Sequence, residues 1–241
     1  MVSEEPGTNG SVWTVVVGVD DSAGAANALG WADALLTNRQ EVGDDGHGVA
    51  VMAWRQPAFD LLGGLTDLDA LEETASVALD GALAELSDPA RFEPVVRLGA
   101  AADVLVEEAD RRDAELIVVG NRGRGVLAEV LLGSVSRSVA SRADRPVAIV
   151  PSPSSSPADW STAPAIVGHD GSPGGQAALG WAVDNIAGPI EVVSAWHLPS
   201  DAIYDPVGID VERFEAGIRA ELQRAIDVVI QARPVGPSLD H

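Results

Sequence analysis

The chain has 241 residues, 46% of them hydrophobic, and its 37 acidic residues against 15 arginines give a formal net charge of −22. It contains no cysteine and no lysine. Disulfides, thiolate zinc sites, lysine-dependent phosphate loops and Schiff-base chemistry are therefore excluded. The acidic excess argues against general binding to nucleic acid or anionic membranes, and no stretch resembles a signal peptide or a membrane span, so we expect a cytoplasmic protein.

Apolar runs and helical segments alternate along the first 151 residues. Residues 12–19 are a continuous apolar run, which is typical of a strand buried inside a parallel sheet. Ser22 is placed to cap the Ala-rich helix that follows. Further strands are expected at 49–54, 92–98, 115–120 and 146–151, with helices at about 67–86, 101–112 and 133–142. This alternation predicts an α/β fold with a doubly wound, Rossmann-like, five-stranded parallel sheet.

The sequence contains an internal repeat. Residues 15–37 and 165–187 share ten identities in 23 positions, and residues 49–57 match 191–199. Between the copies, the Pro- and Ser-rich stretch 151–164 is typical of a linker. We therefore expect a complete domain at 1–151, a linker at 152–164 and a partial second copy at 165–241. That copy ends after a helix at about 211–232 and has no counterpart of the last three strands.

A glycine-rich segment follows the fourth expected strand. Residues 120–136 fit the pattern G-x2-G-x9-G-S, with Gly120, Gly123, Gly133 and Ser134 at the fixed positions. Gly120 and Gly123 are expected to take positive φ, so that backbone N–H groups can approach an anion. Gly133 and Ser134 open a helix, where free N–H groups and the hydroxyls of Ser134 and Ser136 can bind phosphate. The segment predicts a polyphosphate site.

An alternative is that these glycines only form a turn and a helix cap. Residues 120–145 hold five arginines against two acidic residues, in a chain of net charge −22, and this concentration of positive charge favours the anion site. Asp20 ends the first strand, where a carboxylate can accept hydrogen bonds from a ribose or an adenine amine, or can form a turn or cap. Ala53, at the end of the second strand, can offer backbone groups to an adenine edge.

These features resemble the universal stress protein family, through VGVDDS (17–22), MAW (52–54) and VVGNRGRG…LLGSVSRSVASRADRPVAIVP (118–151). The resemblance is to tandem members with an incomplete second domain, and it implies ATP as the ligand. Asp21 departs from the family, in which Gly is commoner. The site residues that the resemblance implies are Asp20, Ala53, Gly120, Gly123, Gly133, Ser134, Val135 and Ser136. Arg122, one of the clustered arginines, is expected to join them.

The expected function is an ATP-binding regulatory protein of the stress response, with little or no hydrolysis. Mg²⁺ can accompany ATP through phosphate oxygens, but the sequence names no protein ligand for it. Two alternatives remain open, namely a slow ATPase or adenylyl-transferring enzyme on the same fold, and a protein-interaction module that binds no nucleotide. A catalytic residue is not expected, because the histidines are placed as surface or packing residues: His47, His169, His197 and His241.

Two further expectations concern partners and packing. The resemblance implies a homodimer formed through the strand Pro146–Pro151, with an unidentified regulatory protein as a further partner. Four tryptophans occupy equivalent positions in the two copies, which predicts that they pack in the cores: Trp31, Trp54, Trp181 and Trp196.

Overall fold

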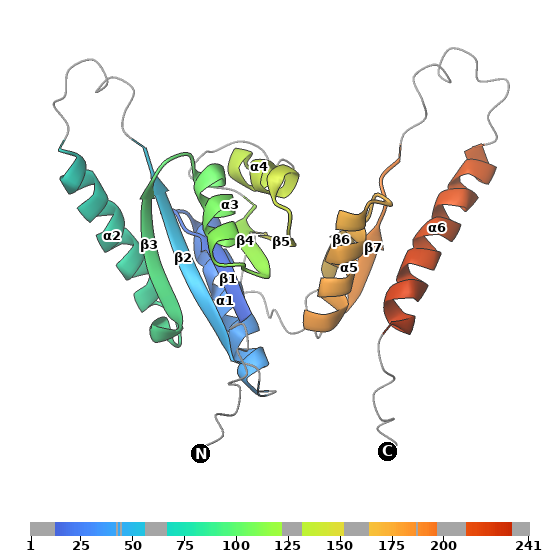
Figure 1. The fold of residues 1–241 in the computed structure, drawn as a ribbon, viewed down its shortest axis with the longest axis horizontal. Coiled ribbons are helices and arrows are strands. Elements are labelled where there is room, and N and C mark those ends of the chain that lie inside the picture. The colour runs from blue at the N-terminus through green and yellow to red at the C-terminus, as the bar shows by residue number, and fades with distance from the viewer. Residues whose placement is uncertain are drawn as a thin grey trace, which may run out of the picture. The chain divides into compact units, whose positions relative to one another are not determined.

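A computed structural model describes residues 13–41, 43, 45–55, 67–121, 132–151, 164–186, 188–196 and 211–232. The described elements form two compact units, the first from β1 to β5 and the second from β6 to α6 (Figure 1). The expected linker lies outside the described residues, apart from Pro164. No helix within the described ranges is long and apolar enough to cross a membrane.

The first unit is an α/β fold built on a five-stranded parallel sheet with strand order β3-β2-β1-β4-β5. Its strands are β1 (Trp13–Gly18), β2 (Gly46–Trp54), β3 (Phe92–Leu98), β4 (Leu116–Gly120) and β5 (Val147–Val150). Its helices are α1 (Ala23–Glu41), α2 (Leu68–Ala84), α3 (Ala101–Arg111) and α4 (Ser134–Arg142), and a short 3-10 turn, Pro89–Arg91, precedes β3. The predicted fold class is confirmed.

Helices cover both faces of this sheet. Helices α3 and α4 pack against each other on one face, while α1 and α2 lie on the other, as right-handed crossovers require (Figure 1). Under α3, apolar side chains of all the inner strands form a buried cluster that includes Val16, Val51, Leu105 and Ile117. Burial on both faces explains why the inner strands read as continuous apolar runs.

Strand β2 begins earlier than predicted, at Gly46 and not at residue 49. Glycine is a poor strand former, but Gly46 and Gly48 pair with Trp13 and Val15 of β1. Pairing with the neighbouring strand therefore extends β2 to these residues. Gly48 also makes room for the edge strand, because a Cβ there would lie 2.3 Å from the ring of Phe92. Propensity alone could not reveal this contact.

The second unit repeats the first β-α-β element and then stops resembling it. Its elements are β6 (Ala165–Gly168), α5 (Pro173–Asn185), β7 (Ile190–Val193) and α6 (Val211–Gln231). Strands β6 and β7 are parallel, and Ala165 faces Ile190 just as Val15 faces Gly48 in the first unit. The expected partial second copy is therefore present as a small two-stranded parallel sheet with two helices.

An ionic cluster ties α3 to the edge strand β3. The carboxylate of Glu108 is only 1% exposed and accepts hydrogen bonds from Arg97 at 2.8 Å, Arg111 at 2.6 Å and Arg112 at 3.4 Å. Burial by itself raises the pKa of Glu108, but the three guanidinium groups outweigh it and hold the pKa below the usual 4.5. Arg112 also forms a two-point ion pair with Glu93.

This cluster predicts an acid-sensitive contribution to stability. A folded-state pKa below the unfolded value adds stability above pH 4.5 and loses it as pH falls through the folded pKa. Glu108→Gln should lower the free energy of unfolding by about 2 kcal/mol at pH 7, because three arginines lose their shared carboxylate. The difference from wild type should shrink as pH falls below 4.5 and through the lowered pKa of Glu108, as followed by urea unfolding across pH.

The matched control is Glu107→Gln on the same helix, where the side chain is exposed and unfolding should change by less than about 0.5 kcal/mol. The ionic role of Glu108 would be contradicted if the free energies of unfolding of the wild type and the Glu108→Gln variant differed by a constant amount from pH 7 to pH 3.

Two glycines should respond in opposite directions to the same substitution. Gly48→Ala places a methyl group 2.3 Å from Phe92 and should destabilise the fold by about 1–3 kcal/mol. Gly81→Ala in α2 meets nothing within 4 Å and should stabilise by about 0.5–1 kcal/mol, since Ala is the better helix former. Both changes in stability can be measured from the midpoints of urea unfolding, provided that the m-value stays constant. If both substitutions changed the stability in the same direction, the packing argument would be refuted.

Candidate functional site

The sheet of the first unit has a switch point between β1 and β4. From β1 the chain proceeds outward to β2 and β3, and it then returns to the other side of β1 to form β4 and β5. Loops leave β1 and β4 in opposite directions at such a point, which opens a crevice at the carboxyl ends of these strands. Asp20 follows β1 and Gly120 ends β4, so the crevice lies where the sequence predicts a site.

Asp20 is half-buried and shapes the turn into α1. Its Oδ1 accepts a hydrogen bond from the Ser22 backbone N–H at 3.1 Å and another from the Ser22 hydroxyl. The Ser22 hydroxyl in turn accepts from the Ala25 N–H at 3.2 Å, which confirms Ser22 as the cap of α1. Within the described part of the chain no donor is assigned to Oδ2 of Asp20, which leaves that oxygen available to a ligand. Asp21 is exposed.

Gly120 serves a different purpose from the predicted one. It does not have positive φ, since among the described glycines only Gly43, Gly99 and Gly171 do. A Cβ on Gly120 would instead lie 2.5 Å from the carbonyl carbon and oxygen of Gly24, in the first turn of α1. The expectation of positive φ is therefore wrong for Gly120. Glycine is needed there because two backbones touch, and this contact brings the start of α1 against the end of β4.

The start of α4 lies directly beside this contact. Asn121 follows Gly120, and its N–H donates to Val150 of β5 at 2.8 Å while its carbonyl accepts from the Gly133 N–H at 2.7 Å. Asn121 thus fixes where α4 begins. Sequence reasoning missed this residue, because its role depends on backbone groups and leaves no side-chain signal.

The cap residue of α4 has no side chain that could bond to the N–H groups of its first turn. Gly133 occupies the cap position with φ −60° and ψ 159° and supplies no side-chain hydrogen bond. The N–H groups of the next three residues therefore have no intrahelical partner: Ser134, Val135 and Ser136. The side chains of Ser134 and Val135 are exposed, so this helix end is open to a ligand. The N–H groups and the helix dipole together favour an anion there.

Ser136 differs from the expectation that its hydroxyl is a free donor. It is 2% exposed, and its hydroxyl donates to the Gly133 carbonyl at 3.0 Å. Only its backbone N–H is left to donate at the helix end. Ser134, in contrast, is exposed at this helix end, so its hydroxyl remains a candidate donor to a ligand.

The backbone of Ala53 faces the crevice. Successive residues of a strand direct their N–H and C=O groups to opposite sides. The carbonyl of Val51 points toward β1, because it accepts from the Val19 N–H at 2.9 Å, and the carbonyl of Trp54 points toward β3, where it accepts from Gly99. The groups of Ala53 therefore face the β1 side, past Gly18, where β1 has ended. The structure thus directs Ala53 and Asp20 to one edge.

The positive charge near α4 is partly neutralised. Arg142 forms an ion pair with Asp103 of α3, and Arg137 donates to the Leu132 carbonyl at 3.2 Å. Arg122 and Gly123 lie outside the described residues, as does Arg124. The described charges therefore contribute less to an anion site than the sequence count indicates.

The described residues include no group of three or more His, Asp or Glu side chains placed to hold a metal ion. His47 lies in β2, with its Nε2 3.7 Å from the Glu93 carboxylate, and it is far along the strand from Ala53. His197 and His241 lie outside the described ranges.

Comparisons with known proteins agree with this architecture. A universal stress protein of Mycolicibacterium smegmatis is 32% identical over 183 residues, which are 70% of this chain and 58% of that protein. The chain thus spans less than two thirds of that relative, and only 34% of a relative from Mycobacterium bovis. A universal stress protein from Archaeoglobus fulgidus shares the fold at 20% identity and a TM-score of 0.50, covering 86% of this chain and 74% of that one.

A further universal stress protein, solved in complex with cAMP, is 29% identical with a TM-score of 0.40 and covers 59% of this chain and 99% of that one. The model of the universal stress protein family matches residues 13–151, which hold the whole five-stranded sheet. The chain belongs to the universal stress protein family.

Proposed function

We propose that the first unit binds ATP at the crevice between β1 and β4 and acts as a nucleotide-dependent regulatory protein in a stress response. The observation that carries the proposal is the open start of α4. Three N–H groups without an intrahelical partner, of Ser134, Val135 and Ser136, lie at a helix end that Asn121 fixes beside Gly120. Such an end is suited to phosphate without any lysine.

The other half of the nucleotide fits the opposite side of the crevice. Oδ2 of Asp20 can accept hydrogen bonds from ribose hydroxyls or an adenine amine, and the backbone of Ala53 supplies one donor and one acceptor. Gly120 supports this arrangement because any Cβ would push α1 away from β4 and widen the crevice. The motif residues Arg122 and Gly123, which lie outside the described residues, would complete the phosphate side.

Magnesium, where it accompanies ATP, would be held by phosphate oxygens, because the described residues bring no cluster of metal ligands to the crevice. The donors named above bind and orient phosphate, and none of them is a base that could activate water. We therefore propose a protein that holds ATP with little or no hydrolysis.

Ser134→Pro tests the α4 donors directly. Proline is favoured in the first turn of a helix, and Gly133 already has the extended conformation that a residue before proline requires. The substitution should keep the fold while removing one N–H and the hydroxyl. ATP affinity, measured by calorimetric titration, should fall about 10- to 100-fold, the cost of one hydrogen bond to a charged group.

Ser134→Ala is the matched control, because it removes the hydroxyl and keeps the N–H, and it should weaken binding less than Ser134→Pro. If the wild type binds ATP and the Ser134→Pro variant binds it with the same affinity, the start of α4 is excluded as the phosphate site.

One observation favours the alternative of an interaction module without nucleotide. Asp170 and Ser172 in the second unit form the same contacts as Asp20 and Ser22, with the Ser172 N–H donating to Asp170 at 3.0 Å. The described part of the second unit includes no counterpart of the glycine-rich segment, so these contacts can form simply to start a helix. Absence of ATP binding at millimolar concentration would support this alternative.

We also propose that β5 mediates a homodimer. It is the edge of the sheet and pairs only with β4 among the described strands. The Val150 carbonyl points toward β4, because it accepts from Asn121, so the N–H and C=O of Ile149 face the open side. A second copy could pair antiparallel with these groups.

Ile149→Pro removes the outward N–H without breaking a bond to β4, and it should convert a dimer of 24.8 kDa chains into a monomer in light scattering. Ile149→Ala keeps the N–H and controls for the loss of side-chain packing, so it should remain dimeric. A wild type that is already monomeric at micromolar concentration would refute the proposal.

A further inference from the structure

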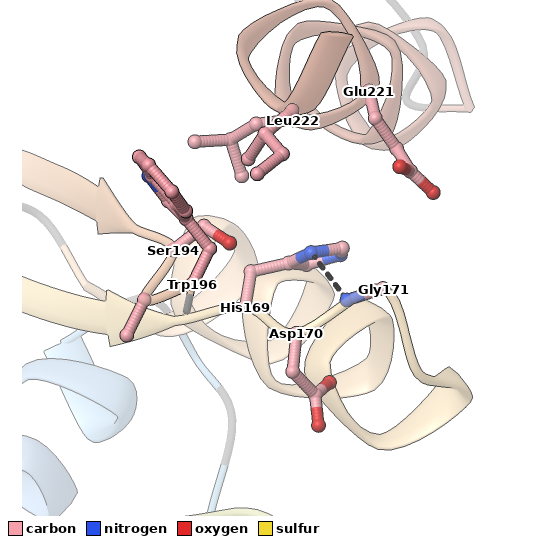
Figure 2. Close-up of a pocket in the computed structure, with 9 residues that line it drawn as sticks. His169, Asp170, Gly171, Ser194, Trp196, Glu221 and Leu222 are labelled. Atoms are coloured by element: carbon pink, nitrogen blue, oxygen red, sulfur yellow. Dashed lines mark hydrogen bonds between the residues drawn. The ribbon is translucent and has the colours of Figure 1, made fainter. Parts of the chain in front are cut away.

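The second unit contains a cavity of about 160 Å³ at the carboxyl ends of β6 and β7, beneath α6 (Figure 2). Its position in the β-α-β element corresponds to that of Asp20 and Ala53 in the first unit, but its chemistry differs. The lining residues that define this chemistry are His169, Asp170, Ser194, Trp196, Glu221 and Leu222.

A hydrogen-bonded relay fixes one wall of the cavity. His169 is 7% exposed, and its Nδ1 accepts from the Gly171 N–H at 3.2 Å, which assigns the ring proton to Nε2. Nε2 lies 3.2 Å from Oε1 of Gln176, whose own amide donates to the Ala225 carbonyl of α6 at 3.1 Å. Both ring nitrogens are therefore occupied, and the ring offers a ligand only its carbon surface.

This relay belongs to the second unit alone. The residues at the equivalent positions of the first unit are Val19 and Ala26, which cannot form it. The relay links β6, α5 and α6, so it holds the helix that roofs the cavity. Because these hydrogen bonds fix the position of α6, the cavity is a defined feature of the second unit and is not a gap left by loose packing.

An aromatic side chain provides a second wall. Trp196 is 37% exposed, so the prediction that it packs in the core is wrong. Phe214 of α6 holds the indole edge-on, with ring centroids 5.3 Å apart. Trp196, Leu222 and the His169 ring lie around one space in Figure 2. Such walls suit a flat ring or another planar group.

The free polar groups at the rim are mostly acceptors. Glu221 is exposed and has no assigned donor among the described residues, and its Oε1 lies 3.7 Å from where a Cβ of Gly171 would stand. Asp170 uses Oδ1 for the Ser172 N–H, and the hydrogen bonds of Ser172 lower the pKa of this carboxyl. The Asp170 carboxylate points away from the cavity in Figure 2, so Glu221 is the acidic group that repels anions and favours N–H donors at the opening.

We propose that this cavity binds a small planar nitrogen compound that presents N–H donors and carries no phosphate. Its volume lies below the range of about 300–1,000 Å³ that drug-sized ligands occupy, which restricts the bound part to one ring system or one planar group. The base of a nucleoside and a guanidinium compound share this chemistry. Either ligand would stack on Trp196 and donate to Glu221, independently of ATP binding in the first unit.

The test uses the full ¹⁵N-labelled chain and three probes, adenosine, agmatine and AMP, each titrated to millimolar concentration. Adenosine or agmatine should shift the amide signals of Gly171 and Ala195 and the indole signal of Trp196, which a Trp196→Phe variant identifies. Which of the two binds distinguishes a base from a guanidinium group. AMP should bind at least tenfold more weakly than adenosine, because the carboxylate of Glu221 repels its phosphate.

Glu221→Lys should weaken binding of whichever probe binds by at least tenfold. Glu215→Lys, an exposed charge reversal on the same helix outside the cavity lining, should leave binding unchanged. The proposal is overturned if neither adenosine nor agmatine shifts these signals, if AMP binds as tightly as adenosine, or if Glu221→Lys has no effect.

The double variant Asp20→Ala with Ser134→Pro separates this proposal from that of ATP binding in the first unit. The shifts at Gly171 and Ala195 should persist in it, whether or not wild-type protein binds ATP. If they disappear, the probe is bound in the first unit and the cavity is not the site.

Discussion

The position of β1, hydrogen-bonded to β2 on one side and β4 on the other, is the constraint on which the carboxyl edge of the sheet depends. β1 ends at Gly18, whereas β2 continues to Trp54, so the backbone of Ala53 extends past the end of its neighbour. On the other side, the contact between Gly120 and Gly24 draws α1 against β4. This edge is uneven because three adjacent strands end at different heights while two helices begin beside them.

The internal repeat separates structural contacts from contacts with a ligand. Asp20 and Asp170 both accept from a serine two residues later, and each serine caps its helix through the N–H three residues further on. Because the described part of the second unit keeps this arrangement with no glycine-rich segment beside it, the carboxylate turn is part of the β-α-β element itself. What the first unit adds is the start of α4, and the argument for phosphate therefore depends on that helix.

The sequence predicts features that local pattern determines and misses those that tertiary contacts determine. The apolar run at 12–19 and the Ser22 cap are local, and both appear in the structure. The reason for Gly120 is a contact with a helix about a hundred residues earlier, and the neutralisation of Arg142 needs Asp103 of another helix. Counting arginines along the chain therefore overstates the local positive field, because the partner of each arginine is not visible in a linear segment.

The two units show how one β-α-β element can favour ligands of opposite polarity. Strand register is the same in both, so the carboxyl edge presents equivalent positions. In the first unit a helix end meets this edge and supplies N–H donors that have no intrahelical partner, which suit an anion. In the second, the side of α6 lies over the edge and supplies Glu221, an acceptor. The element that borders the edge, and not the shared strands, therefore determines whether donors or acceptors are presented there.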